Sequence, residues 1–141
     1  MLLQSIFAQT DERPDILVEL MDPENAKLFH RRVGEILVSP RIMSHVMAHV
    51  ALRRELKVVF DELFTSGGAE IFFRRAEEYD AAGQTVSFAE LEVTAASCEE
   101  IALGICLDDP SDDAPGGVYL NPRKNESWTL TDRDKIIVLA T

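Results

Sequence analysis

The sequence has no long apolar run, few cysteines and a deficit of basic residues. None of its hydrophobic stretches approaches the ~18 to 20 residues that cross a bilayer. The start, Met1-Leu2-Leu3, lacks the basic flank of a signal peptide. We therefore expect a cytoplasmic chain with no direct membrane insertion. Two cysteines, Cys98 and Cys106, fit a reducing compartment in which thiols stay free.

The deficit of basic residues excludes one class of partner. The chain has 14 basic and 25 acidic residues, which gives a net charge of −11. Such a charge opposes binding to phosphate backbones and to anionic lipid surfaces. The basic pairs Arg31-Arg32, Arg53-Arg54 and Arg74-Arg75 are dispersed along the sequence. We predict that nucleic acid is not a partner.

The sequence also lacks the common signatures of enzymes. No G-x-G-x-x-G motif follows a strand, because Gly67-Gly68 precedes one, so no nucleotide site is expected. His45 and His49 have the spacing of metal ligands on a helix, but Val46 occupies the position of a zinc protease's catalytic glutamate. We therefore predict that the chain is not an enzyme and has neither catalytic nor cofactor-binding residues.

Residues 1–40 are expected to form a partial Rossmann-like half-sheet. Apolar strand patterns at Asp15–Leu20 and Glu35–Val38 flank a helical pattern at Glu24–Val33. Asp22-Pro23 supplies a helix cap and a first-turn residue. Strands that alternate with helices are typical of a parallel sheet. A half-sheet exposes an unpaired edge, which predicts a partner chain.

Residues 41–66 are expected to form a helical hairpin, the helix-turn-helix crossover of the fold. The apolar stripe that starts at Ile42 would place arginines in the core if it continued, so the helix must bend near Leu52–Glu55. Apolar faces this rich predict pairing with a second copy, and packing within an ordinary core is the alternative. The residues expected at a dimer interface are Met43, Met47, Val50, Leu56, Phe60 and Phe64.

Residues 67–141 are expected to form a small α+β C-terminal lobe. Together with the partial Rossmann-like half-sheet and the helix-turn-helix crossover that precede it, this lobe gives a predicted fold class of α/β. Ser87 and Glu90 have the spacing of a capping box at the start of a helix over Phe88–Ala96. Two short strand signals joined by a polar turn lie between Ser127 and Ala140. The strands expected in this lobe are Glu70–Arg74, Ile101–Leu107, Val118–Leu120 and Lys135–Leu139.

An acidic loop is the main candidate for ligand chemistry. Asp108, Asp109, Asp112 and Asp113 crowd carboxylate oxygens into a short segment, and oxygen ligands suit calcium. The spacing is not that of an EF-hand, since a glycine at the sixth position and a glutamate at the twelfth are both missing. Three interpretations of this loop remain open: a calcium site, a solvated surface loop and a contact with another protein.

The order of these elements resembles the cytosolic regulatory domain of the Castor and Pollux ion-channel family, a domain of the regulator-of-potassium-conductance type. The residues that carry the resemblance are Glu19 and Asp22 at the end of the first strand, Asn25, Gly34-Glu35, Phe88, Asn121-Pro122 and Asp134–Val138. The nucleotide-binding part of the family's Rossmann-like half is not matched.

The resemblance implies a gating role without catalysis. It implies a regulatory domain of a potassium-type or other cation channel or transporter, which assembles as a dimer or ring and responds to a ligand. The domain would be membrane-associated if it belongs to a longer channel subunit, and it would act on its own pore or on a separate subunit. A free-standing dimeric ligand-binding module unrelated to channels is the alternative.

Overall fold

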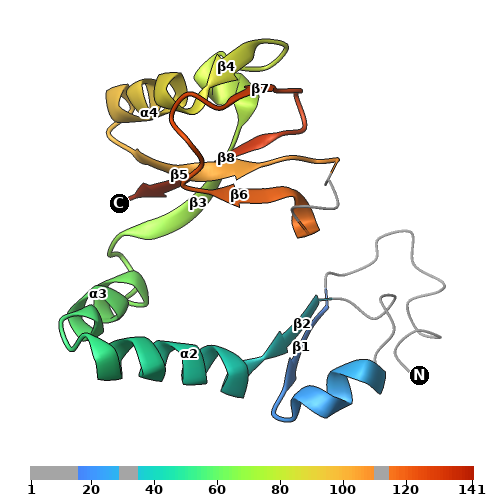
Figure 1. The fold of residues 1–141 in the computed structure, drawn as a ribbon, viewed down its shortest axis with the longest axis vertical. Helices are drawn as coiled ribbons and strands as arrows, with labels where there is room; N and C mark the ends of the chain where they lie inside the picture. The colour runs from blue at the N-terminus through green and yellow to red at the C-terminus, as the bar shows by residue number, and fades with distance from the viewer. Residues whose placement is uncertain (1–15, 29–34, 110–114) are drawn as a thin grey trace. The chain divides into compact units, whose positions relative to one another are not determined.

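The computed structural model describes residues 16–28, 35–109 and 115–141. The chain divides into two compact units, residues 1–58 and 59–141, and each is described by itself. Figure 1 shows the order of the elements along the chain. The first unit carries a small parallel sheet and a long helix, and the second carries an antiparallel sheet with one covering helix.

The first unit contains the predicted parallel strands. Strands β1 (Leu17–Leu20) and β2 (Glu35–Val38) pair in parallel. Between them, the short 3-10 helix η1 (Pro23–Leu28) begins where an Asp22 side-chain oxygen accepts a hydrogen bond from the Glu24 N–H at 2.9 Å. The cap expected at this position is confirmed. The helix expected over residues 24–33 is a 3-10 helix as far as residue 28, and its remainder lies outside the described residues.

The predicted bend between two helices is confirmed. Helix α2 (Ser39–Leu52) has proline in its first turn, where the missing N–H is tolerated. It ends because Arg53 adopts an extended backbone, with φ −142° and ψ 94°, while the Arg53 N–H still bonds to the His49 carbonyl. Helix α3 (Leu56–Leu63) then restarts with a new apolar phase. The bend keeps the charged residues after Leu52 out of the apolar stripe.

The second unit is built on a four-stranded antiparallel sheet in the order β3-β8-β5-β6. One face of this sheet carries the core, with Ile105, Ile136 and Val138 fully buried. Helix α4 (Phe88–Ser97) covers the core with Phe88 and Leu91. The strands are β3 (Glu70–Arg75), β5 (Ile101–Cys106), β6 (Val118–Leu120) and β8 (Lys135–Ala140).

The capping box at the start of α4 is confirmed in detail. The Glu90 N–H donates to Ser87 Oγ at 3.3 Å, and the Ser87 N–H donates to Glu90 Oε2 at 2.7 Å. Strand β4 (Thr85–Ser87) leads into this cap and pairs with β7 (Ser127–Thr129) in a two-stranded antiparallel sheet. The two strand signals between residues 127 and 140 therefore join different sheets.

A polar cluster ties the end of β3 to the start of β5. The Arg74 guanidinium donates to Glu100 Oε1 from Nε and one Nη, and the buried Tyr79 hydroxyl of the 3-10 helix η2 (Ala76–Tyr79) donates to Glu100 Oε2. Burial raises the pKa of Glu100, but these hydrogen bonds outweigh it and hold the pKa below its ordinary value. The cluster fixes the edge strand β3 against the rest of the unit.

These elements confirm the predicted fold class. Helices and strands are mixed along the chain, and the strands form one four-stranded and two two-stranded sheets within the described residues. No sheet among them closes into a barrel. The chain is therefore an α/β protein with an α+β C-terminal part.

Candidate functional site

The apolar face of α2 is the first candidate surface. None of the residues of α2 is buried. Met43 is 55% exposed and Met47 is 67% exposed, while Val50 is half-buried. Their spacing places all three side chains on one face of the helix. An apolar face left this open in a folded unit is typical of a surface that binds another chain.

Helix α3 carries a second apolar stripe. Leu56 and Phe60 are half-buried, and Phe64, directly after the helix, is 72% exposed. The rings of Phe60 and Phe64 are stacked, with centroids 6.1 Å apart. A cavity of about 620 Å³ opens beside these rings and is lined by Phe60, Leu63, Phe64, Thr65, Ser66, Glu70 and Ile71. Two of the three predicted interface residues on this stripe, Phe60 and Phe64, thus border a hollow that an apolar side chain could fill.

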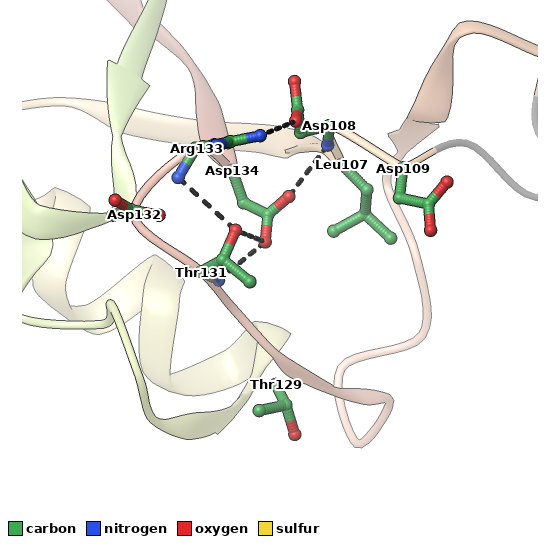
Figure 2. Close-up of a pocket in the computed structure, with 8 residues that line it drawn as sticks. All are labelled: Leu107, Asp108, Asp109, Thr129, Thr131, Asp132, Arg133 and Asp134. Atoms are coloured by element: carbon green, nitrogen blue, oxygen red, sulfur yellow. Dashed lines mark hydrogen bonds and ion pairs between the residues drawn. The ribbon is translucent and has the colours of Figure 1, made fainter.

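A polar pocket at one end of the main sheet is the second candidate site (Figure 2). It has a volume of about 490 Å³ and lies where β5 ends and the turn before β8 begins. The Arg133 guanidinium lies 3.7 Å from the Asp108 carboxylate at its rim. The lining residues are Leu107, Asp108, Asp109, Thr129, Thr131, Asp132, Arg133 and Asp134.

Asp134 holds this pocket together. The residue is only 4% exposed, and its carboxylate accepts hydrogen bonds from the Asp108 N–H at 2.8 Å, the Thr131 N–H at 2.6 Å and the Thr131 hydroxyl at 2.8 Å. Burial raises the pKa of Asp134, but the hydrogen bonds outweigh it and the pKa lies below its ordinary value. The residue is therefore a fixed, ionised acceptor that joins the β7–β8 turn to the segment after β5.

Two of the four predicted calcium ligands lie at this pocket. Asp108 and Asp109 are exposed on its rim, and Asp112 and Asp113 lie outside the described residues. Within the described ranges, no group of three or more His, Cys, Asp or Glu side chains could hold a metal ion. The calcium site at the acidic loop stays a prediction.

Sequence reasoning missed Asp134 and Thr131 as residues of this site. A signal exists in the sequence, because Thr131 and Asp134 are three residues apart in a polar turn, where such side chains bond to nearby backbone groups. Their bond to Asp108, 26 residues away, requires the fold. The turn could therefore be predicted from the sequence, but the long-range contact could not.

The other residues singled out from the sequence stay apart. His45 and His49 are exposed on α2, and neither joins a metal-binding group among the described residues. Cys98 and Cys106 are both free. No helix in the described ranges is both long and apolar enough to cross a membrane.

Fold and surfaces together define the class: a mixed α/β chain of two small units with exposed apolar helices and a polar pocket. No protein-family model matches the chain. It is 29% identical over 127 residues to the ion channel CASTOR of Lotus japonicus, which covers 88% of this chain and 14% of that channel. It is 27% identical over 121 residues to the probable ion channel POLLUX of Oryza sativa subsp. japonica, covering 83% of this chain and 12% of the channel.

A third relative extends the match along the chain. The ion channel DMI1 of Medicago truncatula is 24% identical over 137 residues, which covers 94% of this chain and 15% of that channel. The resemblance to the Castor and Pollux ion channels is thus confirmed over most of the chain. The chain spans only about one-seventh of the length of the Lotus relative.

Proposed function

We propose that this chain is a non-enzymatic regulatory domain of a potassium-type or other cation channel or transporter. The observation that carries the proposal is the similarity of most of the chain to a segment of plant ion channels. The described helices include none that could cross a membrane, which fits a gating domain rather than a pore. The domain acts in the cytoplasm, on a pore in the same polypeptide or in a separate subunit.

The proposed mechanism is a shift in the balance between two assemblies. Copies of the domain pair through their exposed helical faces and form a dimer or ring. A ligand that binds one arrangement of the copies more tightly shifts the gating equilibrium by its differential affinity. The domain contributes binding energy to the pore and no bond chemistry.

The exposed apolar side chains of α2 and α3 support pairing. Burying a side chain such as Met47 or Phe64 in a partner contributes roughly 1.5–3 kcal/mol relative to leaving it in water. The hollow beside Phe60 adds a place where a partner's side chain could be enclosed. Aromatic and methionine side chains are also enriched at interface centres.

Phe60→Asp is expected to reduce the molar mass of the chain in solution by at least half. A carboxylate at the centre of the α3 stripe would have to be desolvated on pairing, which is costly. Light scattering coupled to gel filtration measures the mass. Val58→Asp is the matched control, because Val58 is 71% exposed on the opposite side of the same helix. An unchanged mass for Phe60→Asp, or equal losses in both variants, would contradict the pairing surface.

Calcium is the proposed ligand of the acidic loop, and its binding is expected to change the assembly. The molar mass of the chain, measured over a range of concentrations, should respond to millimolar calcium but not to sodium chloride of equal ionic strength. Asp108→Asn combined with Asp109→Asn removes two carboxylates and should abolish the response. A response that survives in this variant would contradict the site, and an unresponsive wild-type chain would contradict calcium as the ligand.

A further inference from the structure

The two edges of the main sheet differ in how they are protected. At one edge, β6 has only three residues, and it is closed off by Asn121 with φ +45° and by Pro122. Short strands and proline are common ways of blocking an edge against pairing. At the other edge, β3 runs for six residues without interruption and has β8 as its single strand neighbour among the described residues.

The unprotected edge is apolar at its centre. Ile71 and Phe73 point to the sheet face opposite the core and are 55% and 53% exposed. Phe72 points to the core face, where the Arg74 guanidinium lies 5.0 Å above its ring and is itself held by Glu100. The strand is therefore fixed in place, and its centre offers both backbone groups and apolar side chains to a further strand.

We propose that the free edge of β3 pairs in antiparallel fashion with the β3 edge of a second copy of this chain. This edge contact is distinct from the helical faces of the proposed function, and it would join two four-stranded sheets into one continuous sheet. A contact of this kind is isologous, so the strand must be complementary to itself.

The sequence of β3 is complementary to itself in one register, in which Phe72 of one copy lies directly opposite Phe72 of the other. Ile71 of one copy then lies opposite Phe73 of the other, on the open face of the sheet. Glu70 lies opposite Arg74 on the core face, and symmetry makes both pairs occur twice. Aromatic pairs with β-branched residues and pairs of opposite charge are the cross-strand contacts that stabilise sheets. Arg74 uses two of its donor groups for Glu100, which leaves others for a partner carboxylate.

The neighbouring register is less favourable. With Phe73 at the centre, Ile71 would lie opposite Arg75, and Glu70 would lie opposite Ala76 beyond the strand. The apolar pairs and the charge pairs would both be lost. The occupant that fits the edge is therefore a second copy held in the Phe72-centred register.

A mixed disulfide tests the pairing and its register together. Ile71→Cys and Phe73→Cys are prepared as separate full-length chains of different mass tag, both carrying Cys98→Ser and Cys106→Ala. Directly opposed positions are close enough for a disulfide, whereas positions two residues out of register lie about 7–8 Å apart. Mild oxidation is expected to give the mixed dimer, with little cross-linking of either variant alone.

The other edge provides a matched control. Val118→Cys mixed with Leu120→Cys repeats the same spacing on the same sheet face at β6, where both side chains are exposed. No mixed dimer is expected there. A Phe73→Cys chain that cross-links with itself, equal yields at both edges, or no cross-link at β3 would each overturn the proposal.

The result is separable from that of the helical pairing. Adding Met47→Asp to both cysteine variants should leave the mixed cross-link intact, because Met47 lies on α2 and takes no part in the strand contact, whereas Phe60 lines the same cavity as Glu70 and Ile71. Glu70→Arg should weaken edge pairing by about tenfold, because two attractive charge pairs become repulsive. A cross-link abolished by Met47→Asp, or unaffected by Glu70→Arg, would assign the association to the helical faces and overturn the edge contact.

Discussion

Replacing Asp134 with alanine is expected to lower the free energy of unfolding of the second unit by about 3 kcal/mol. The carboxylate accepts from two backbone N–H groups and one hydroxyl, and a buried donor left without its acceptor costs roughly 1–3 kcal/mol. Urea unfolding of the full chain measures the loss. Trp128, the sole tryptophan, packs against the core of this unit and reports its unfolding by fluorescence.

Asp132→Ala is the control for this variant. Asp132 lines the same pocket and carries the same charge, but it is exposed. A surface substitution of this kind usually changes stability by no more than about 0.5 kcal/mol. Equal losses in the two variants would mean that the pocket's charge, and not the buried acceptor, determines the stability.

The same carboxylate gives the stability a defined dependence on pH. Because the pKa of Asp134 is lower in the folded chain than in the unfolded chain, its contribution is fully present above the ordinary aspartate pKa. The contribution is lost as the pH falls from about 4 through the folded-state pKa. The stability advantage of the wild type over Asp134→Asn should therefore narrow below pH 4. A constant difference across that range would contradict an ionised Asp134.

Local signals predicted most elements of the second unit. The Ser87–Glu90 capping box could be read from spacing alone, because both of its hydrogen bonds join residues three apart. The edge strand was predicted over Glu70–Arg74 after the boundary at Gly67-Gly68, and it extends one residue further, to Arg75. Elements whose stabilising interactions join residues a few positions apart are the ones that can be predicted from a single sequence.

Pairing between distant segments could not be predicted in the same way. The strand at Thr85–Ser87 is too short to give a pattern of its own, and it exists through its partner at Ser127–Thr129. The bond from the Asp108 N–H to Asp134 likewise depends on β5 and β8 being neighbours. Such contacts depend on the order of the strands in the sheet, and the periodicity of a single segment does not indicate that order.

The bend between α2 and α3 shows what periodicity does determine. The predicted break was located by the arginines that would otherwise enter the apolar stripe, and α2 ends at Leu52 as that argument requires. Periodicity also identified the side chains on one face of α2, such as Met43 and Met47. It does not say what covers them, so their role at a dimer interface stays a prediction.

Gly104→Ala is expected to lower the free energy of unfolding by about 3 kcal/mol, at the upper end for a single small substitution into a packed site. Gly104 lies in the central strand β5 opposite Leu120 of β6, directly after a bulge. A Cβ added there would lie 2.1 Å from the Tyr119 carbonyl oxygen and 3.0 Å from the Leu120 Cα. Since these neighbours are backbone atoms, β6 itself must move.

The displacement has a spectroscopic signature. The rings of Tyr119 and Trp128 lie 6.3 Å apart, so a shift of β6 should alter the near-ultraviolet circular dichroism before unfolding begins. Gly83→Ala is the control, because Gly83 has φ +75° but no heavy atom within 4 Å of an added Cβ. It should cost only about 1 kcal/mol of backbone strain and leave the aromatic signal unchanged. If Gly104→Ala were as mild as this control, the close approach of β5 and β6 would not require glycine at this position.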